Sequence, residues 1–472
     1  MVFSSNIFLF LFLPIVFLCY FGFTKSIGIR NLILLFFSLV FYCFGEIQYL
    51  WLLLISLVCN YFFGIFLDKN LSNNSRKKLI IFLAIFFNIS LLGYYKYYNF
   101  FQENLQSFLN INLPVKSIIL PLGISFFTFH SISYLVDIYR KKCHVQKNFF
   151  NLALYICFFP QLISGPIVRY NFISKYLTNR KIHHSAIAFG IRLFLIGFTK
   201  KILIANPLGE LADSIFNSNP QDLNRLIGIV GVVSYTLQIY FDFSGYCDMA
   251  IGLARIFGFR FPINFNYPYI ALSIKDFWRR WHISLSTWFR DYVYIPLGGN
   301  RVGLFRQYFN LILVFFLCGL WHQASWNCII WGLFHGSFLV LERFKFYQKI
   351  LENLPKIFQN FYMLFLVMIG WIFFRSNDLS SSINLLKIIA FDNPIQQMPF
   401  NIAKILNSHF LQMSFILGII GYSPIIKNLS KSLIHKNKIF VILIDVILIL
   451  LFLLSIIRLS SQTHNPFIYF QF

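Results

Sequence analysis

Long apolar runs recur along most of this 472-residue chain, and many are close to the length that crosses a lipid bilayer. A membrane-spanning helix needs about 20 mostly apolar residues, because the hydrocarbon core of a bilayer is about 30 Å thick. Inside lipid every backbone polar group must be satisfied within the protein, so such runs predict helices. The clearest runs cover residues 6–23, 31–44, 49–67, 79–93, 117–138 and 439–457. Less regular runs lie near residues 149–168, 186–205, 226–258, 305–321, 325–341, 359–374, 381–391 and 409–426.

Composition supports the same fold class. Only 12% of the residues are charged, whereas soluble domains carry about 25%. Including broken or re-entrant pieces, we expect an all-α polytopic membrane protein with about 11–13 membrane segments. No soluble domain is detectable, so residues 1–472 are expected to form a single membrane domain. Its expected parts are N-terminal helices over 1–115, a core over 116–376 and C-terminal helices over 377–472.

The formal net charge of +24 is explained by membrane topology rather than by binding to nucleic acid. Alternate short loops carry the positive charge, as expected when basic loops remain in the cytoplasm. These loops contain Lys25 and Arg30, then Lys69 and Arg76–Lys78, then Arg140–Lys142 and Lys147. The pattern predicts an N-terminus outside the cytoplasm, contacts with anionic lipid headgroups and no nucleic-acid partner. The eight Cys show no CxxC or Cys/His metal spacing, so no metal site is expected.

One segment breaks the alternation of the loops. Arg169, Lys175, Arg180 and Lys181 form a further basic loop after the single apolar segment 149–168. That segment contains Pro160, Gly165 and Pro166 within "FFPQLISGPIVRY". Non-helical backbone persists at membrane depth only where protein buries it or where it lines a water-filled cavity. We therefore expect residues 149–168 to enter the membrane and return on the same side.

The block "DFWRRWHISLSTWFRDYVYIPLGGNR", residues 276–301, is too polar to span lipid. On a helix, Trp278, Trp281, Leu285 and Trp288 fall on one apolar stripe. Arg279, Arg280, His282 and Ser286 lie off this stripe. The pattern predicts a helix in the membrane interface, with indoles among the headgroups and guanidinium groups toward water and phosphate. Anchoring of this kind does not require the imidazole of His282.

His322 follows a long apolar run in "FLCGLWHQASWNCIIWGLFHG". An ionisable side chain at such a depth is costly and is a functional candidate by default. Imidazole is the side chain best suited to moving a proton near neutral pH. The alternative is a buried His that is hydrogen-bonded only for packing. We favour a structural or supporting role for His335, thirteen residues further on.

Two carboxylates, Asp242 and Asp248, interrupt an apolar region that is expected to be helical. Unpaired carboxylates are rarely retained in lipid, so each is expected to meet an Arg, a Tyr hydroxyl or a helix N-terminus. Pairing with residues such as Arg255 or Arg279 is favoured over direct catalysis. His130, alone on an apolar helix, is expected to be a satisfied core residue.

Several kinds of chemistry lack their motifs in this chain. There is no Gly-rich phosphate loop followed by Lys-Ser/Thr, no GxSxG elbow and no HExxH. ATP hydrolysis and conventional Ser hydrolase chemistry are therefore disfavoured. The remaining features are two His forty residues apart, each of which follows a Trp, Trp281 and Trp321.

Five stretches in order along the chain resemble the membrane-bound O-acyltransferase (MBOAT) superfamily. They are "FPQLISGPIVRY", "DFSGYCDMAIGLARIFGFRFPINFNYPY", "DFWRRWHISLSTWFRDYVYIPLGGNR", "CGLWHQASWNCIIWGLFHG" and "GWIFFRS". More narrowly, they resemble the bacterial branch that modifies alginate, peptidoglycan and teichoic acid. The resemblance implies a ring of helices around a central funnel. It also implies that residues 116–376 form the catalytic core.

The resemblance implies that His322 is the catalytic His and that His282 is the second active-site His. Gln323 departs from the family pattern, in which Gly commonly follows the catalytic His. Expected supporting or substrate-binding residues are Trp281, Arg279, Arg280, Arg290, Trp288, Trp321, Asp242 and His335. The three Arg are candidates for donor phosphates, because guanidinium pairs with phosphate bidentately.

The implied reaction is acyl transfer from a thioester to a hydroxyl, most readily acetyl from acetyl-CoA as co-substrate with no bound cofactor. The donor is expected from the cytoplasm of a bacterium whose inner membrane holds the protein. The acceptor is expected to be an envelope polysaccharide, reached through a periplasmic acetyltransferase partner of the SGNH type. The alternatives are a transporter or flippase for an envelope glycan precursor, and a catalytically silent scaffold for a periplasmic enzyme.

Overall fold

The computed structural model describes residues 2–22, 26–111, 118–392, 398–437 and 439–461. Lys25, one of the loop charges above, lies outside these ranges, as does the first residue of the expected run 117–138. Throughout the described residues the regular structure is helical, without a strand. The expectation of an all-α polytopic protein is confirmed.

Six helical stretches are long and apolar enough to cross a membrane, counted over the described part of the chain. They are Ile27–Lys69, Asn74–Leu109, Arg225–Ile256, Leu304–His322, Lys356–Arg375 and Ile439–Ser461. A seventh is the pair Phe400–Leu406 and His409–Gly421, which is bent by 62°. Shorter apolar helices cover Phe8–Gly22, Trp326–Leu341 and Leu379–Phe391. The chain is a multi-pass membrane protein.

The chain separates into two compact units. The first unit contains Met1–Phe194 and Met249–Pro262, and the second contains Leu195–Asp248 and Ile263–Phe472. Helix α12 (Arg225–Ile256) contributes to both units, because its last turns from Met249 belong to the first.

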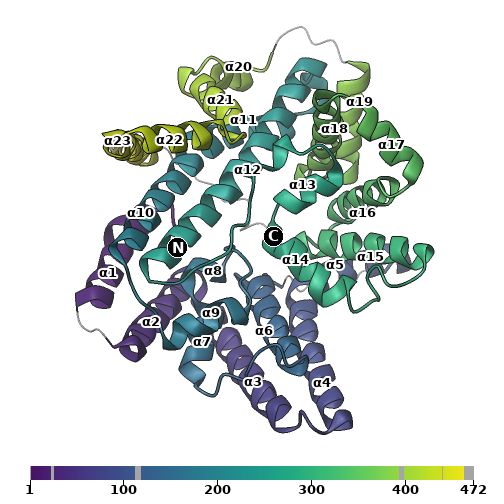
Figure 1. The fold of residues 1–472 in the computed structure, drawn as a ribbon. Helices are drawn as coiled ribbons and strands as arrows, with labels where there is room; N and C mark the ends of the chain where they lie inside the picture. The colour runs from purple at the N-terminus through teal and green to yellow at the C-terminus, as the bar shows by residue number, and fades with distance from the viewer. Residues whose placement is uncertain (1, 23–25, 112–117, 393–397, 438, 462–472) are drawn as a thin grey trace. The chain divides into compact units, whose positions relative to one another are not determined.

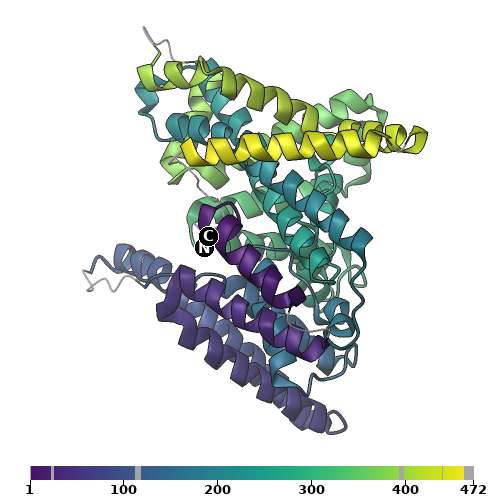
Figure 2. The same cartoon turned by 90° about the vertical axis from the view of Figure 1, so that its left-hand side faces the viewer.

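In the first unit, α3 (Leu50–Lys69), α4 (Asn74–Leu92) and α6 (Ile124–Tyr139) pack against one another. Figures 1 and 2 both show α3 and α4 running side by side as a long hairpin. The amides of Asn60 and Asn88 hydrogen-bond to each other across this hairpin, at 2.7 and 3.2 Å. Both side chains are buried, and mutual hydrogen bonding removes the cost of placing polar groups among apolar ones.

The expected interruption of residues 149–168 is present in the first unit. Helix α7 (Phe149–Cys157) ends before the four-residue α8 (Phe159–Leu162), and non-helical backbone leads to α9 (Tyr170–Thr178). The Tyr155 hydroxyl donates to the Val168 carbonyl at 3.0 Å, so the protein itself satisfies part of the broken backbone. That both flanks face the cytoplasm stays a prediction.

In the second unit, α15 (Leu304–His322) and α16 (Trp326–Leu341) form the most closely packed helix pair. Helices α13 (Ile274–Arg280) and α18 (Lys356–Arg375) pack against α16 and against each other. The C-terminal α23 (Ile439–Ser461), yellow in Figure 2, packs on α22 (Ile425–Lys436). The four helices α13, α15, α16 and α18 surround the residues considered next.

Candidate active site

The block 276–301 forms two short helices rather than one. Helix α13 ends at Arg280, and α14 (Ile283–Phe289) begins after His282, whose φ is +41°. Both oxygens of Asn264 accept hydrogen bonds from backbone amides that would bond within the helix if it were continuous. The Asn264 carbonyl accepts from Ile283 N–H at 3.0 Å, and its Oδ1 accepts from Ser284 N–H at 3.0 Å. The expected continuous helix is therefore wrong at His282.

The expected position of the indoles is also wrong. Trp278, Trp281 and Trp288 are 7%, 2% and 5% exposed, so they pack inside the protein and not among headgroups. Trp281 lies against Phe265 and Trp371, with ring centroids 5.0 Å apart in each case. A surface anchor would expose these rings. Instead, the block turns its aromatic side into the second unit.

Asn264 also fixes the imidazole of His282. Its Oδ1 lies 3.3 Å from His282 Nδ1, and its Nδ2 donates to Cys247 Sγ at 3.1 Å. Because Oδ1 already accepts from Ser284 N–H, the proton of the imidazole is assigned to Nδ1 and the lone pair to Nε2. Burial lowers the pKa of His282 to about 3, so the ring is neutral near pH 7.

His322 is the last residue of α15 and is 2% exposed. Its ring centroid lies 4.9 Å from Trp321, 5.2 Å from Trp331 and 5.2 Å from Phe374. The His282 ring is 6.5 Å away, centroid to centroid. The fold thus brings together two imidazoles that are forty residues apart in sequence.

The end of α15 suits a group that gains a proton. The carbonyl end of a helix carries partial negative charge, which stabilises a cation there. Close packing of α15 on α16 sets the position of this end. A Cβ on Gly319 would collide with the Cys328 carbonyl, so only glycine permits this approach. His322 is thereby held against Trp331 of α16.

His335 lies among aromatic rings on α16. Trp278 and Trp331 are each 5.3 Å from it, centroid to centroid. A Cβ on Gly370 would meet His335 Nε2 at 2.6 Å. Neither ring nitrogen has a hydrogen-bond partner among the described residues. Trp331 contacts both His335 and His322 and therefore links the two imidazoles. A supporting role for His335 stays a prediction.

The carboxylates of α12 pair with lysines, not with the arginines expected. Asp242 Oδ1 lies 2.6 Å from Lys201 Nζ, and Asp248 Oδ2 lies 2.7 Å from Lys200 Nζ. Asp242 and Lys201 are 1% and 3% exposed. Both lysines begin the π-helical turn Lys200–Ala205, and such widened turns are frequent at functional sites. The expected pairing with Arg255 or Arg279 is therefore wrong, and no sequence pattern indicated this turn.

The three arginines named for donor phosphates differ in how they are paired. Arg280 Nε lies 3.0 Å from Asp276, and Arg290 Nε lies 2.6 Å from Asp291. Arg279 is exposed, and no ion pair with a described residue is found for it. Trp288, on α14, contacts Phe289 and Tyr292. Phosphate binding by these arginines stays a prediction, and Arg279 is the best placed of them.

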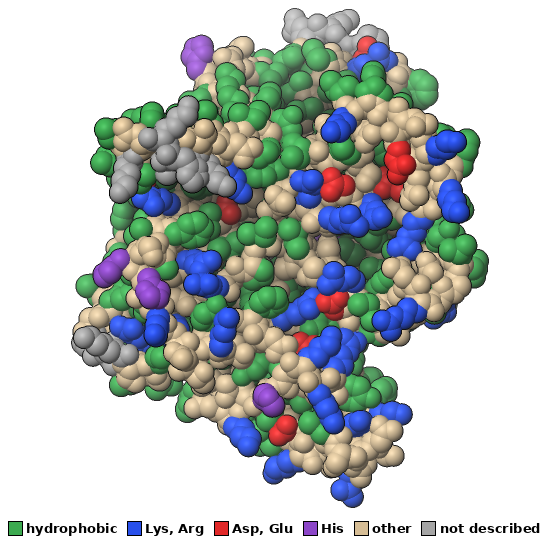
Figure 3. Space-filling model, in the orientation of Figure 1, with side chains coloured by type: hydrophobic (Ala, Val, Ile, Leu, Met, Phe, Trp, Pro, Cys, Tyr) green, Lys and Arg blue, Asp and Glu red, His purple; other side chains and the backbone are tan. Residues whose placement is uncertain are grey.

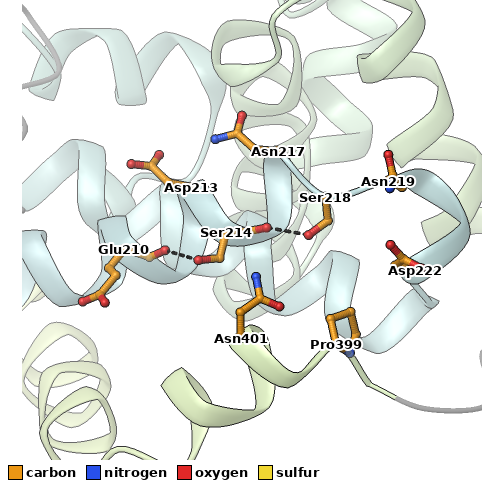
Figure 4. Close-up of a pocket in the computed structure, with 9 residues that line it drawn as sticks. All are labelled: Glu210, Asp213, Ser214, Asn217, Ser218, Asn219, Asp222, Pro399 and Asn401. Carbon is orange, nitrogen blue, oxygen red and sulfur yellow. Dashed lines mark hydrogen bonds between the residues drawn. The ribbon is translucent and has the colours of Figure 1, made fainter.

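A polar hollow of about 530 Å³ lies at the end of α11 (Asn206–Phe216). Figure 4 shows its lining residues, Glu210, Asp213, Ser214, Asn217, Ser218, Asn219, Asp222, Pro399 and Asn401. Asp213 Oδ1 lies 2.5 Å from Arg375 Nη2. Arg375 directly follows Phe374, whose ring contacts His322. The hollow therefore lies at the same end of α18 as the paired imidazoles.

Asn264, Lys200 and Lys201 were not among the predicted site residues. Asn264 lies within "FPINFNYPY", and a signal was available there, since an amide among apolar residues needs partners. The lysines gave no comparable signal, because basic residues near membrane helices usually face headgroups.

Comparison with known proteins shows the family of this chain. Residues 39–375, which include both His282 and His322, match the MBOAT, membrane-bound O-acyltransferase family, and the chain belongs to it. The protein is therefore an acyltransferase.

Among its relatives, the probable alginate O-acetylase of Azotobacter vinelandii is 37% identical over the full length of both chains. The peptidoglycan O-acetyltransferase of Helicobacter pylori is 39% identical, over 82% of this chain and 79% of its own. The teichoic acid D-alanyltransferase of Bacillus subtilis is 32% identical, over 50% of this chain and 62% of its own.

Proposed function

We propose that this acyltransferase moves acetyl from cytoplasmic acetyl-CoA to hydroxyls of a cell-envelope polysaccharide, across a bacterial inner membrane. The observation that carries the proposal is the pairing of His282 and His322, with ring centroids 6.5 Å apart among aromatic side chains. The relatives support the acyl group and the acceptor class, because two of them are named as O-acetylating enzymes of alginate or peptidoglycan.

His322 is the proposed general base. It removes the proton of the attacking hydroxyl while the oxygen adds to the thioester carbonyl. The carbon–sulfur bond then breaks, and the thiolate takes the proton back from the imidazolium. A positioned base contributes about 10²–10⁴-fold to the rate. The helix terminus at His322 supports this role, because its partial charge stabilises the imidazolium.

His282 is proposed to orient the reacting hydroxyl. With the proton on Nδ1, its Nε2 is a hydrogen-bond acceptor, which suits an incoming hydroxyl better than an oxyanion. Asn264 is the proposed positioning residue, because it holds both the imidazole and the two amides that follow it. Trp281 and Trp321 exclude water from the thioester.

Donor and acceptor are proposed to approach from opposite faces of the membrane. Arg279 is the proposed contact for donor phosphates, since Arg280 and Arg290 are occupied by Asp276 and Asp291. The hollow near Asp213 is the proposed approach for the acceptor, because carboxylate and amide groups hydrogen-bond well to sugar hydroxyls. A periplasmic transferase of the SGNH type is the proposed partner that completes transfer to the polysaccharide.

The test gives radiolabelled acetyl-CoA to inverted membrane vesicles that contain the protein. Wild type is expected to transfer label to a glycan or a partner protein, and His322→Ala is expected to lower transfer at least about 10²-fold at equal protein level. His409→Ala, which changes an exposed His on α21 (His409–Gly421), is the control and keeps full activity.

Other outcomes identify the alternatives. Equal labelling by wild type and His322→Ala removes His322 as the base. Glycan that crosses the membrane without label indicates a flippase. Absence of both label and glycan movement in a complete system indicates a scaffold.

A further inference from the structure

The first unit contains a basic pocket that acyl transfer at His322 does not explain. A hollow of about 320 Å³ lies between the end of α9 and the C-terminal end of α12. Its charged and titratable lining residues are Lys175, Arg180, Lys181, His183, Arg255 and Arg260. No Asp or Glu lies among the residues that line it in the described chain. An uncompensated group of cations in a pocket requires either a ligand or solvent ions.

Arg180 is the buried base of this pocket, with 6% of its surface exposed. Neutral groups hold two of its nitrogens. Nε donates to the Tyr20 hydroxyl at 3.0 Å, and Nη1 donates to Asn31 Oδ1 at 2.7 Å. The guanidinium also stacks on Phe259, 4.4 Å from the ring centroid. These contacts therefore hold the guanidinium of Arg180 in one position.

The third nitrogen of Arg180 has no hydrogen-bond partner in the part of the chain that the structure describes. Nη2 is buried and makes no hydrogen bond to any described residue. A buried cation without a counter-charge is costly, and charges are buried in proteins mainly when they are paired. Burial lowers the pKa of Arg180, and the nearby Arg30 adds to this shift. The guanidinium of Arg180 therefore lacks a counter-anion among the described residues that line the pocket.

Arg255, near the end of α12, repeats this pattern. Its Nε is also buried without a hydrogen-bond partner among the described residues. A second, smaller hollow of about 260 Å³ shares Arg255, Arg260 and His183 with the first. The two hollows share these basic residues and are treated together as one basic recess. Figure 3 shows the same tendency on a larger scale, with Lys and Arg more abundant than Asp and Glu among apolar side chains on the face in view.

Gly258 allows the backbone to pass close to Arg180. Its φ is +86°, and a Cβ there would meet Arg180 Cδ and Ile182 Cγ1, each at 3.1 Å. A larger residue would therefore press on the stem of the buried arginine. The backbone, the aromatic ring below and the neutral hydrogen-bond partners together hold the guanidinium in a defined place.

We propose that this recess, defined by Arg180, Arg255 and Arg260, is a binding site for a phosphate group. Guanidinium nitrogens bind phosphate oxygens bidentately, and a phosphate would supply the anion that the described residues lining this recess do not provide. The phosphate belongs either to the headgroup of an anionic phospholipid or to a soluble nucleotide. Both have the same recognition chemistry, and the test separates them.

The test uses the purified full-length protein, stripped of lipid in neutral detergent. Native mass spectrometry measures binding of phosphatidylglycerol, phosphatidylcholine and adenosine 3′,5′-bisphosphate. Wild type is expected to bind phosphatidylglycerol or the bisphosphate, and to prefer phosphatidylglycerol over phosphatidylcholine if the source is a lipid. Arg255→Gln with Arg260→Gln is expected to weaken that binding at least about tenfold, from the loss of two charge-assisted contacts.

A matched control removes the same charge elsewhere in the first unit. Arg76→Gln with Lys78→Gln changes two exposed residues of α4, and binding is expected to stay within about twofold of wild type. Binding to Arg180→Gln is measured as well. If Arg180→Gln does not fold, the variant with Arg255→Gln and Arg260→Gln tests the proposal alone. Selective binding of phosphatidylglycerol assigns the site to lipid, and selective binding of the bisphosphate assigns it to a nucleotide.

Two results would overturn the proposal. One is that neither phosphate-bearing probe binds wild type. The other is an equal loss of binding in the pocket and control variants, which would indicate attraction by net charge alone. Because the readout is binding and not acetyl transfer, failure of this proposal is distinguishable from failure of the proposed enzymatic function.

Discussion

The His282–His322 site and the basic recess at Arg180 differ in whether their charged groups are paired within the protein. In the second unit, Asp242 pairs with Lys201, Arg280 with Asp276, and the paired imidazoles lie among neutral rings. In the first unit, Arg180 and Arg255 each keep a buried nitrogen without a partner among the described residues, and none of the described residues that line their pocket is a carboxylate.

The difference indicates what each region is built to do. A catalytic base must accept a proton, and a buried site whose charges are paired internally suits the proposed role of His322. A binding site for an anion needs positive charge that the protein itself does not neutralise. The two regions therefore differ in charge compensation, and this difference fits the two proposed roles better than net charge does.

The largest expected effect on stability comes from breaking an internal pair. Asp242→Asn leaves Lys201 buried without its counter-charge, which is expected to cost about 3–5 kcal/mol. Arg260→Gln, in the basic recess, is expected to change stability by less than about 0.5 kcal/mol because it breaks no described ion pair. Thermal unfolding of the two purified variants measures this contrast. Similar losses of stability in both variants would contradict the difference in charge compensation between the two regions.

The next effect concerns the orientation of His282. Asn264→Ala frees the imidazole and is expected to lower kcat about 10–100-fold with a smaller change in KM. Asn264→Asp keeps the acceptor for Nδ1 and is expected to recover part of kcat. The added charge also raises the pKa of His282, so an acidic inflection should enter the pH profile of kcat. An equal loss in both variants without that inflection would indicate a purely structural role.

A smaller effect tests the arginines of α13 and of the turn after α14. Arg279→Gln is expected to raise KM for acetyl-CoA about three- to tenfold and leave kcat nearly unchanged, since it removes a contact to a bound phosphate. Arg290→Gln is the matched control, because Asp291 already occupies that guanidinium. Steady-state kinetics over a range of acetyl-CoA concentrations measures both. A larger effect on KM from Arg290→Gln would reverse the assignment.

The last effect is the dependence of stability on pH. His282 binds a proton near pH 6.5 when unfolded but only near pH 3 when folded, so the unfolded chain takes up more protons between these values. Acidification therefore favours unfolding, by about 1.4 kcal/mol for this residue at pH 5.5. Thermal midpoints of wild type and His282→Asn at pH 7.5 and 5.5 test the sign. The variant should lose less stability on acidification, and an equal loss would show that His282 does not titrate in this way.

Much of the candidate site could be proposed from local sequence. His322 interrupts a long apolar run, and an ionisable group there needs a function or a partner. His282 stood out because membrane anchoring does not account for an imidazole. The short helices around it were less predictable, because the amides that break the helix bind Asn264, eighteen or more residues earlier in the chain.

Partners of buried charges were predicted less well. Asp242 was expected to be paired, and it is, but with Lys201 rather than an arginine. The π-helical turn at Lys200 depends on the packing of that segment in the second unit, and no short pattern in the sequence encodes it. Burial of Trp278 and Trp288 was likewise hidden, because an apolar stripe has the same spacing whether lipid or protein covers it.

The sequence alone determined that this chain lives in a membrane as a bundle of helices, because lipid leaves the backbone few other ways to satisfy its hydrogen bonds. It also marked the two imidazoles, since polar groups in apolar runs are costly. Only the tertiary structure decided which groups meet, because contacts between distant residues depend on how helices pack. It placed His282 beside His322 and paired Asp242 with Lys201. It also left one buried nitrogen of Arg180 without a hydrogen-bond partner among the described residues.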